Sequence, residues 1–222
     1  MTPYFDRDGI TIYHARCEDV LPSIDPASVD FLLTDPPYGI NLDTANQARG
    51  RSVGKRKHSR SLDHPRVHGD AEPFDPARLL VYGRAVLFGA NNFASRLPDT
   101  PSWIVWDRQS GDSDTADAEL AWTNLGGTVR TFRHTWNGVC RDSEIGWHVH
   151  PTQKPTALMR WIIDRWTKPG DLVLDPYMGS GPVAQACADL GRRYIGIELV
   201  EDYCKVAVTR LRQGTLDFGG AA

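Results

Sequence analysis

The sequence lacks the features of several protein classes. No hydrophobic run approaches the roughly 20 residues of a membrane span, and the first residues, MTPYFDRDG, are too polar for a signal peptide. The four cysteines are scattered without C-x-x-C spacing, which argues for reduced thiols and against a zinc site. A formal net charge of −3 over 222 residues gives no global attraction for nucleic acid, so any basic surface must be local. We therefore expect a cytoplasmic protein without a metal.

Strand-like segments recur along the chain, and several of them are hydrophobic almost throughout. They lie at residues 10–15, 29–34, 85–90, 102–107, 128–136, 171–175 and 193–198. Such strands are typical of a mostly parallel sheet that is covered on both faces. Helical patterns at 155–167, 181–191 and 201–214 alternate with the later strands. The sequence thus predicts a single α/β domain over residues 1–222, with a doubly wound, mostly parallel sheet.

The segment FLLTDPPYGI, at residues 31–40, ends a predicted strand with two prolines. Proline has no backbone N–H and restricts the residue before it, so the chain from Asp35 to Pro37 is stiff and extended. A carboxylate and an aromatic ring, Asp35 and Tyr38, are thereby held at the edge of a core strand. On composition alone, such a tetrapeptide is more often a surface turn than a functional site.

A glycine turn follows another predicted strand in VLDPYMGSGPVAQA. Asp175 ends that strand, and Gly179-Ser180-Gly181 leads into a helix, where glycines let a ligand approach the backbone and its free N–H groups closely. Glu198 ends the next strand, 19 positions beyond Gly179, as expected for an acidic residue that binds ribose hydroxyls. This order favours a nucleoside-bearing cofactor (NAD, FAD or S-adenosylmethionine) over a purely structural βαβ turn.

Two polar segments accompany these motifs. Residues 41–69 are basic, with the cations Arg49, Arg51, Lys55, Arg56, Lys57, Arg60 and Arg66. A flexible solvated loop is the usual interpretation of such a segment, but its position directly after Tyr38 favours contact with a phosphate backbone. The segment HVHPTQKP, at 148–155, places Thr152, Gln153 and Lys154 at the entrance of a helix, where they either hold a carboxylate or only cap the helix.

Three motifs, DPPY at 35–38, HPTQKP at 150–155 and DPYMGSG at 175–181, resemble in type and order those of the amino-group DNA methyltransferases. The chain is similar to the permuted beta-type members of the DPPY family, and in particular to small adenine-N6 methylases of phages and prophages. The resemblance covers most of the chain. It implies a circularly permuted Rossmann-like fold with the catalytic half first and the cofactor half last. It also implies S-adenosyl-L-methionine as cofactor and DNA as substrate.

The resemblance implies a role for each motif. Asp35 and the carbonyl of Pro36 would accept hydrogen bonds from the exocyclic amine, Pro37 would fix the geometry, and Tyr38 would stack on the flipped base. The cofactor-binding residues would be Asp175, Pro176, Tyr177, Gly179, Ser180, Gly181 and Glu198, with Thr152, Gln153 and Lys154 at the methionine carboxylate. The Cys17 backbone, Glu18 or Asp19 would lie near the adenine. The sequence has no Pro-Cys dipeptide of the kind that carbon-5 cytosine methylases use.

The chain departs from the family pattern in three places. Ala15 and Arg16 stand where the family often has Gly-Asp, Pro182 replaces a threonine, and no separate target-recognition domain is visible. Loops 41–69 and 137–149 would then make most DNA contacts, and a homodimer and a cognate restriction enzyme are candidate partners by family analogy. The aspartate of DPPY favours adenine-N6 over cytosine-N4. Methylation of RNA or protein, and an inactive cofactor- or DNA-binding module, are the remaining alternatives.

Overall fold

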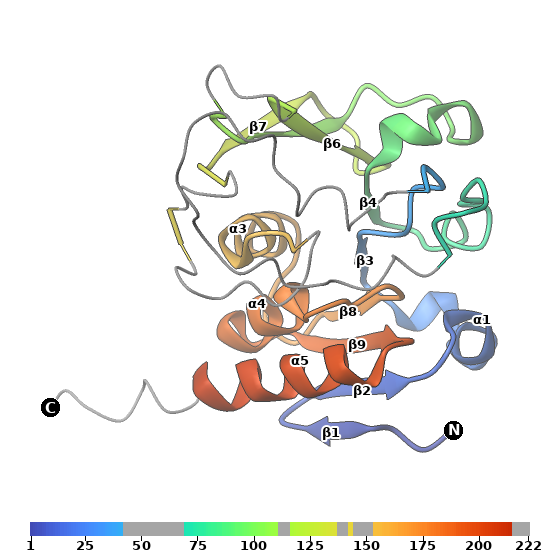
Figure 1. The fold of residues 1–222 in the computed structure, drawn as a ribbon, viewed down its shortest axis with the longest axis vertical. Helices are drawn as coiled ribbons and strands as arrows, with labels where there is room; N and C mark the ends of the chain where they lie inside the picture. The colour runs from blue at the N-terminus through green and yellow to red at the C-terminus, as the bar shows by residue number, and fades with distance from the viewer. Residues whose placement is uncertain (42–68, 111–115, 137–141, 144–152, 215–222) are drawn as a thin grey trace, which may run out of the picture.

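The computed structural model of the protein describes residues 1–41, 69–110, 116–136, 142–143 and 153–214 (Figure 1). All strands within these ranges lie in one sheet of order β1-β2-β9-β8-β3-β4-β6-β5-β7. Their bounds are β1 Phe5–Arg7, β2 Ile10–His14, β3 Phe31–Thr34, β4 Ala85–Phe88, β5 Trp103–Asp107, β6 Ala118–Thr123, β7 Arg130–Arg133, β8 Leu172–Asp175 and β9 Arg193–Glu198.

The centre of the sheet is parallel, because β2, β9, β8, β3 and β4 all run in the same direction. The edges are mixed: β1 is antiparallel to β2, and β6 is antiparallel to both β4 and β5. The central strands β3, β4 and β8 are buried along their whole length, which explains their continuous hydrophobic sequences. The expected α/β class is confirmed. The sheet is mixed, with a parallel centre and antiparallel pairs toward its edges.

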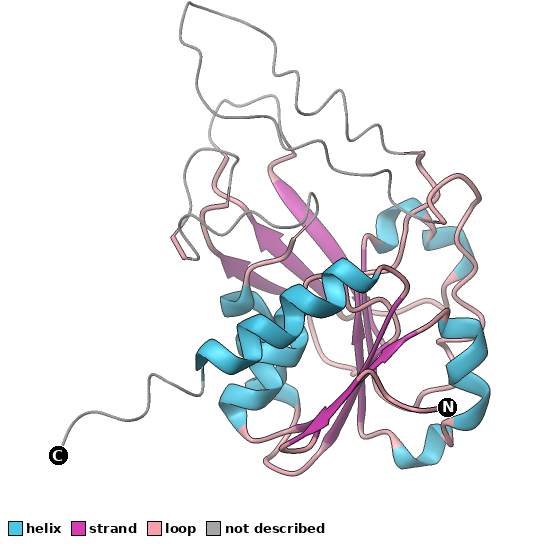
Figure 2. Ribbon diagram, turned by 60° about the horizontal axis from the view of Figure 1, so that its bottom comes forward, coloured by secondary structure: helices cyan, strands magenta, loops and turns pink. Residues whose placement is uncertain are grey.

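Helices lie on both sides of this sheet (Figure 2). The longer ones, α3 (Thr156–Trp166), α4 (Pro182–Leu190) and α5 (Glu201–Gly214), pack against one another on one side. The single turn α1 (Cys17–Val20) lies on the other side, next to β9. Gly191 ends α4 in the left-handed conformation, at φ 67°, as its position after the helix predicts.

A change in the direction of the connections occurs between β8 and β3. The strand that follows β8 in sequence, β9, lies on one side of it, whereas β4, which follows β3, lies on the opposite side. The two central strands are in register, with Phe31 opposite Val173 and Leu32 opposite Leu174. At such a switch point the chain leaves the carboxyl ends of both strands in opposite directions and opens a crevice, which is where open α/β sheets bind ligands.

Sequence patterns located most of these elements but not all. The predicted strand at 128–136 is shorter, since β7 covers only Arg130–Arg133. Strands β1 and β6 were not predicted: β1 has only three residues, and the charged Glu119 interrupts β6. Helix α3 buries Leu158 and Ile162 as expected, but Trp161 and Trp166 are only half buried, because they pack at the side of the core near Phe132.

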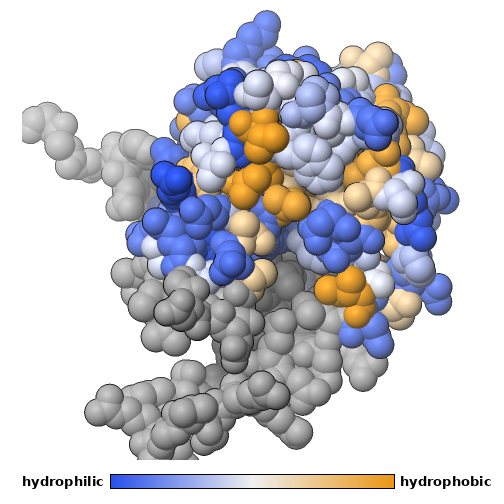
Figure 3. All heavy atoms as spheres, turned by 90° about the horizontal axis from the view of Figure 1, so that it is seen from above, coloured by the Kyte–Doolittle hydropathy of each residue, from blue (hydrophilic) through white to orange (hydrophobic). Residues whose placement is uncertain are grey.

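Several class-level features follow from the described residues. Among them, no helix combines the length and hydrophobicity that a membrane crossing requires, and no three acidic, histidine or cysteine side chains are grouped as metal ligands. Cys17, Cys187 and Cys204 are buried free thiols, and Cys140 lies outside the described residues. On the face shown in Figure 3, hydrophobic residues form small patches separated by hydrophilic ones.

Candidate active site

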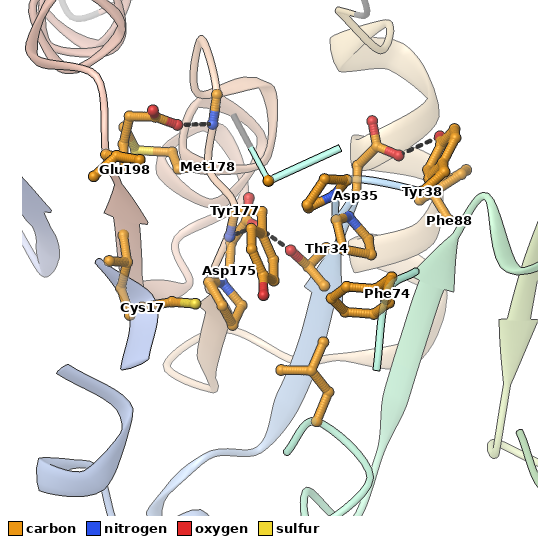
Figure 4. Close-up of a pocket in the computed structure, with 18 of the residues that line it drawn as sticks. Cys17, Thr34, Asp35, Tyr38, Phe74, Phe88, Asp175, Tyr177, Met178 and Glu198 are labelled. Carbon is orange, nitrogen blue, oxygen red and sulfur yellow. Dashed lines mark hydrogen bonds between the residues drawn. The ribbon is translucent and has the colours of Figure 1, made fainter. Parts of the chain in front are cut away.

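A pocket of about 750 Å³ opens at the carboxyl ends of β3, β8 and β9. Asp35, Asp175 and Glu198 line it, each at the end of one of these strands or just beyond it. Figure 4 shows Glu198 and Cys17 on one side, Asp35 and Tyr38 on the other, and Asp175 between them. A volume of this size suits one drug-sized ligand with room for a second small group.

The two central strands are joined at the pocket by a buried hydrogen bond. The Oγ1 of Thr34 donates to Oδ1 of Asp175 at 2.6 Å, and Oδ2 of Asp175 accepts from the hydroxyl of Tyr194 at 3.3 Å. Burial raises the pKa of Asp175 to about 7, although these hydrogen bonds oppose the rise. Asp35 and Asp175 therefore line one crevice, at the carboxyl ends of two adjacent parallel strands.

Both carboxylate oxygens of Asp35 have protein partners. Oδ1 accepts from the Tyr38 hydroxyl at 2.5 Å, and Oδ2 accepts from Nζ of Lys154, also at 2.5 Å. Burial lowers the pKa of Lys154, but the carboxylates of Asp35 and Glu119 outweigh it and hold the pKa well above its ordinary value. Burial and the negative charge of Asp35 raise the pKa of Tyr38, so that its hydroxyl stays protonated and donates.

The ring of Tyr38 packs directly against Gly89, in the turn after β4. A Cβ added to Gly89, whose φ is +65°, would come within 1.9 Å of Cε1 of Tyr38. Gly89 is thus required both for its left-handed backbone and for the space that the ring occupies. Asp70 fixes the chain that leaves the tetrapeptide, because its Oδ1 accepts from the backbone N–H of Gly39 at 2.8 Å and of Ile40 at 3.3 Å.

The glycine turn and Glu198 form the opposite wall of the pocket. Oε2 of Glu198 accepts from the N–H of Gly179 at 2.8 Å, and its Oε1 accepts from the N–H of Val200 at 2.7 Å. Gly181 has φ +77°, and a Cβ there would lie 2.7 Å from the Cβ of Ala207, so α4 and α5 approach closely only with glycine at this position. The turn is therefore compact and held against the end of β9.

One polar group in this wall has no partner among the residues that the structure describes. The hydroxyl oxygen of Ser180 is buried, its residue is 2% exposed, and it makes no hydrogen bond to any described residue. A buried hydroxyl without a partner costs free energy, so its place on the wall of a pocket fits a polar ligand that would satisfy it. The turn thus fits the bound cofactor that the sequence predicts.

Aromatic and thiol side chains line the pocket between Asp35 and Glu198. Tyr177 contacts Phe74 edge-to-face, with ring centroids 5.8 Å apart, and Phe74 packs against Phe93 in the same way at 5.0 Å. Burial raises the pKa of the Cys17 thiol, and the nearby Tyr177 side chain partly opposes the rise. These neutral groups form a largely hydrophobic wall suited to an aromatic heterocycle.

The structure brings together nearly all of the catalytic and cofactor-binding residues that the sequence indicated. The pocket is lined by Cys17, Asp35, Pro36, Pro37, Tyr38, Gln153, Lys154, Asp175, Pro176, Tyr177, Gly179, Ser180 and Glu198. Gly181 lies just behind the turn, as the N-cap of α4. Thr152 and the six cations proposed for DNA binding, Arg49, Arg51, Lys55, Arg56, Lys57 and Arg60, lie outside the described residues.

Four residues that shape the site had no role assigned from the sequence: Thr34, Asp70, Gly89 and Glu119. Their partners are distant in sequence, for example 141 positions between Thr34 and Asp175 and 31 between Gly39 and Asp70. The glycine after the strand at 85–88 was the only available signal, since a glycine at a strand end often marks a close approach.

Comparison with known proteins agrees with this geometry. A family model described as DNA methylase (N6_N4_Mtase) matches residues 105–209, slightly less than half of the chain. The type II methyltransferase M2.LlaDCHI of Lactococcus lactis subsp. cremoris is 23% identical, over 96% of this chain and 93% of its own length.

Solved structures share the fold. The M1.HpyAVI structure in complex with S-adenosylmethionine (SAM) is 24% identical, with a TM-score of 0.56 over 91% of this chain and 98% of that one. PvuII DNA methyltransferase, which is cytosine-N4-specific, is 14% identical, with a TM-score of 0.59 over 90% of this chain and 86% of that one. The pocket, the family model and the type II relative together support a DNA methyltransferase, with S-adenosyl-L-methionine as its cofactor.

Proposed function

We propose that this protein transfers a methyl group from S-adenosyl-L-methionine to the exocyclic N6 amine of adenine in DNA. The observation that carries the proposal is the meeting of two motifs in one pocket. Asp35, in its proline-stiffened tetrapeptide, lies beside Asp175, which precedes the glycine turn, and the Thr34–Asp175 hydrogen bond of 2.6 Å joins their strands. The family model and the type II relative favour DNA as the substrate.

The residues of the tetrapeptide would prepare the amine for attack. The lone pair of an exocyclic amine is delocalised into the ring, which makes it a poor nucleophile. A hydrogen bond from the amine to the Asp35 carboxylate, and a second to the Pro36 carbonyl, would draw the nitrogen toward a tetrahedral shape and hold it in line for transfer. Tyr38 would stack on the base after it leaves the DNA helix. The proton that the methylated amine loses would pass to Asp35 or to water.

The wall opposite Asp35 would hold the cofactor. When bound there, S-adenosylmethionine supplies an electrophilic methyl group on a sulfonium sulfur. Glu198 would accept from ribose hydroxyls, and the Gly179–Gly181 turn would admit the cofactor close to the backbone. The hydroxyl of Ser180 would gain a partner, and the surface of Tyr177 and Cys17 would contact the adenine. Thr152 and Gln153 stay proposals for the methionine carboxylate.

Cytosine-N4 is the alternative target. The name of the matching family model covers both kinds of amine, and PvuII DNA methyltransferase has the same fold and is cytosine-specific. Both amines need the same hydrogen-bond acceptors, so the geometry at Asp35 suits either. We favour adenine because the tetrapeptide begins with aspartate, which the resemblance associates with adenine.

The test is direct. The protein is incubated with isotopically labelled S-adenosylmethionine and DNA, and the DNA is digested to nucleosides for chromatography. Label in N6-methyladenine is the expected result. Label in N4-methylcytosine would replace the target base but keep the reaction class, whereas absence of label in DNA across varied sequences would contradict the proposed function.

We also propose that Arg49, Arg51, Lys55, Arg56, Lys57 and Arg60 contact the DNA backbone. Each phosphate contact contributes about 0.9 to the slope of log affinity against log salt concentration. Replacing Lys55, Arg56 and Lys57 together by glutamine should therefore lower the slope by up to about three. Lys205→Gln, an exposed change on α5, is the control. An unchanged slope in the triple variant would return this segment to a solvated loop.

The subtype of methyltransferase domain is also a proposal. A permuted, doubly wound beta-type domain over 1–222 without a separate target-recognition domain is supported by the order of the motifs and by the switch point between β8 and β3. A relation to small phage methylases, a homodimer and a cognate restriction enzyme are proposed from the resemblance, and a cytoplasmic location from the scattered cysteines. Size measurement of the protein with and without DNA tests the dimer.

A further inference from the structure

A row of alternating charges extends from Asp35 into the neighbouring part of the sheet. Nζ of Lys154 lies 2.5 Å from Oδ2 of Asp35 and 3.1 Å from Oε2 of Glu119. The other oxygen of Glu119, Oε1, lies 3.4 Å from Nη1 of Arg108. Asp35 follows β3, Glu119 belongs to β6 and Arg108 follows β5, so the row connects the tetrapeptide to strands on the far side of β4.

The ammonium of Lys154 is fixed by this arrangement. Its side chain is only 4% exposed, and its three N–H donors are matched by three acceptors: Asp35, Glu119 and the Tyr38 hydroxyl, the last at 3.2 Å. The rings of Tyr38 and Phe88 lie 5.8 Å and 5.6 Å from Nζ. Burying an ammonium is costly unless it is paired, so both carboxylates are needed to keep Lys154 in place.

Arg108, which pairs with Glu119, is itself fixed by further contacts. Nε and Nη2 of Arg108 donate to the backbone oxygen of Trp136 at 3.2 Å and 3.0 Å, and its guanidinium lies 5.5 Å from the ring of Trp106. The Glu119 carboxylate is thus anchored on a strand of the sheet, with Arg108 on one oxygen and Lys154 on the other. Lys154 lies in the segment just before α3, and its ion pair with Glu119 fixes its position relative to the sheet.

We propose, building on the methyltransferase function above, that Glu119 and Lys154 are positioning residues that orient the Asp35 carboxylate toward the target amine. Lys154 holds Oδ2, which leaves Oδ1 as the oxygen offered to the base. Oδ1 carries the Tyr38 hydroxyl in this structure, and a carboxylate oxygen can accept a second hydrogen bond. Lys154 then serves the catalytic aspartate, and the methionine carboxylate of the cofactor is not its main partner.

This role predicts a specific kinetic pattern. Glu119→Gln keeps the shape of the side chain but removes the charge that holds Lys154. Because small misplacements of a positioned group cost up to about 100-fold in rate, we expect kcat to fall about 10-fold or more, with KM for S-adenosylmethionine and the thermal midpoint nearly unchanged. Glu201→Gln, which breaks an exposed ion pair with Lys205 on α5, is the matched control and should leave kcat unchanged.

A double-mutant cycle tests whether Glu119 acts through Lys154. Lys154→Met should lower kcat at least as much as Glu119→Gln, and adding Glu119→Gln to it should have no further effect, because nothing remains for Glu119 to hold. Equal fold-losses from Glu119→Gln with and without Lys154→Met would overturn the inference. So would a Glu119→Gln or Lys154→Met variant that raises KM for the cofactor at full kcat, since that places the lysine at the cofactor.

A substitute variant covers a failure to fold, and the activity of the wild type separates the two proposals. If Lys154→Met does not fold, Lys154→Gln takes its place, and if neither folds, the split between kcat and KM in Glu119→Gln decides. A wild-type protein that methylates no base contradicts the proposed function itself. An active wild type whose Glu119→Gln variant retains full kcat contradicts only the positioning role.

Discussion

Replacing Thr34 by valine removes the hydroxyl that joins β3 to β8 without changing the shape of the side chain. Thr34 is 1% exposed and its partner Asp175 is 2% exposed, so no water replaces the lost donor. A hydrogen bond to a charged group contributes about 1.5–3 kcal/mol to folding and one between neutral groups about 0.5–1.5 kcal/mol. The cost of Thr34→Val therefore depends on whether Asp175 is ionised.

The pKa of Asp175 sets the direction of this dependence. In the folded protein it is about 7, above the ordinary 3.8, because burial penalises the ionised form. With respect to this group the free energy of unfolding is therefore highest below pH 3.8 and falls as the pH rises to about 7. Thr34 stabilises the ionised form, and valine would raise the pKa of Asp175 further. We expect Thr34→Val to cost about 1 kcal/mol at pH 5 and about 2 kcal/mol at pH 9.

The assay is urea unfolding of the wild type and the variant at both pH values. Thr123→Val is the control, since Thr123 is also fully buried at a strand end but bonds only neutral groups: Oγ of Ser102 at 3.2 Å and the N–H of Leu125 at 3.1 Å. Its cost should be the same at pH 5 and pH 9. An equal cost of Thr34→Val at both pH values, or a larger cost at pH 5, would refute the reasoning.

Three further changes test other parts of the pocket. Gly89→Ala should displace the Tyr38 ring and lower kcat at least about tenfold. It should also lower the free energy of unfolding by about 1–2 kcal/mol, because of the left-handed backbone. A wild-type kcat would contradict the proposed packing of Tyr38 against Gly89. Asp35→Ala should lower methyl transfer by about 100-fold or more, while calorimetry shows unchanged S-adenosylmethionine affinity; loss of both would mean that Asp35 serves the cofactor. Ser180→Ala should leave the free energy of unfolding unchanged or slightly higher, because the hydroxyl has no described partner, and weaken cofactor binding by up to about tenfold; unchanged affinity would exclude a contact.

The sequence by itself determined most of the elements and the position of the site along the chain. Buried parallel strands are hydrophobic throughout, glycine and proline mark the turns, and a carboxylate directly after a strand must lie at its carboxyl end. Asp175 and Glu198 could therefore be placed at strand ends, and Asp35 directly after a strand, before any contact was known. The short β1 and the interrupted β6 could not, since a few residues carry too little periodicity.

The tertiary structure decided how the charges of the site are paired. Lys154 follows an ordinary helix-entry pattern in sequence, and only the fold brings it to Asp35, 119 positions away, and to Glu119 on β6. The close approach of Tyr38 to Gly89, and the pKa of about 7 at Asp175, likewise depend on side chains from separate strands. Burial and partner distance set these energies, and both are properties of packed neighbours in space, which the linear order of residues does not specify.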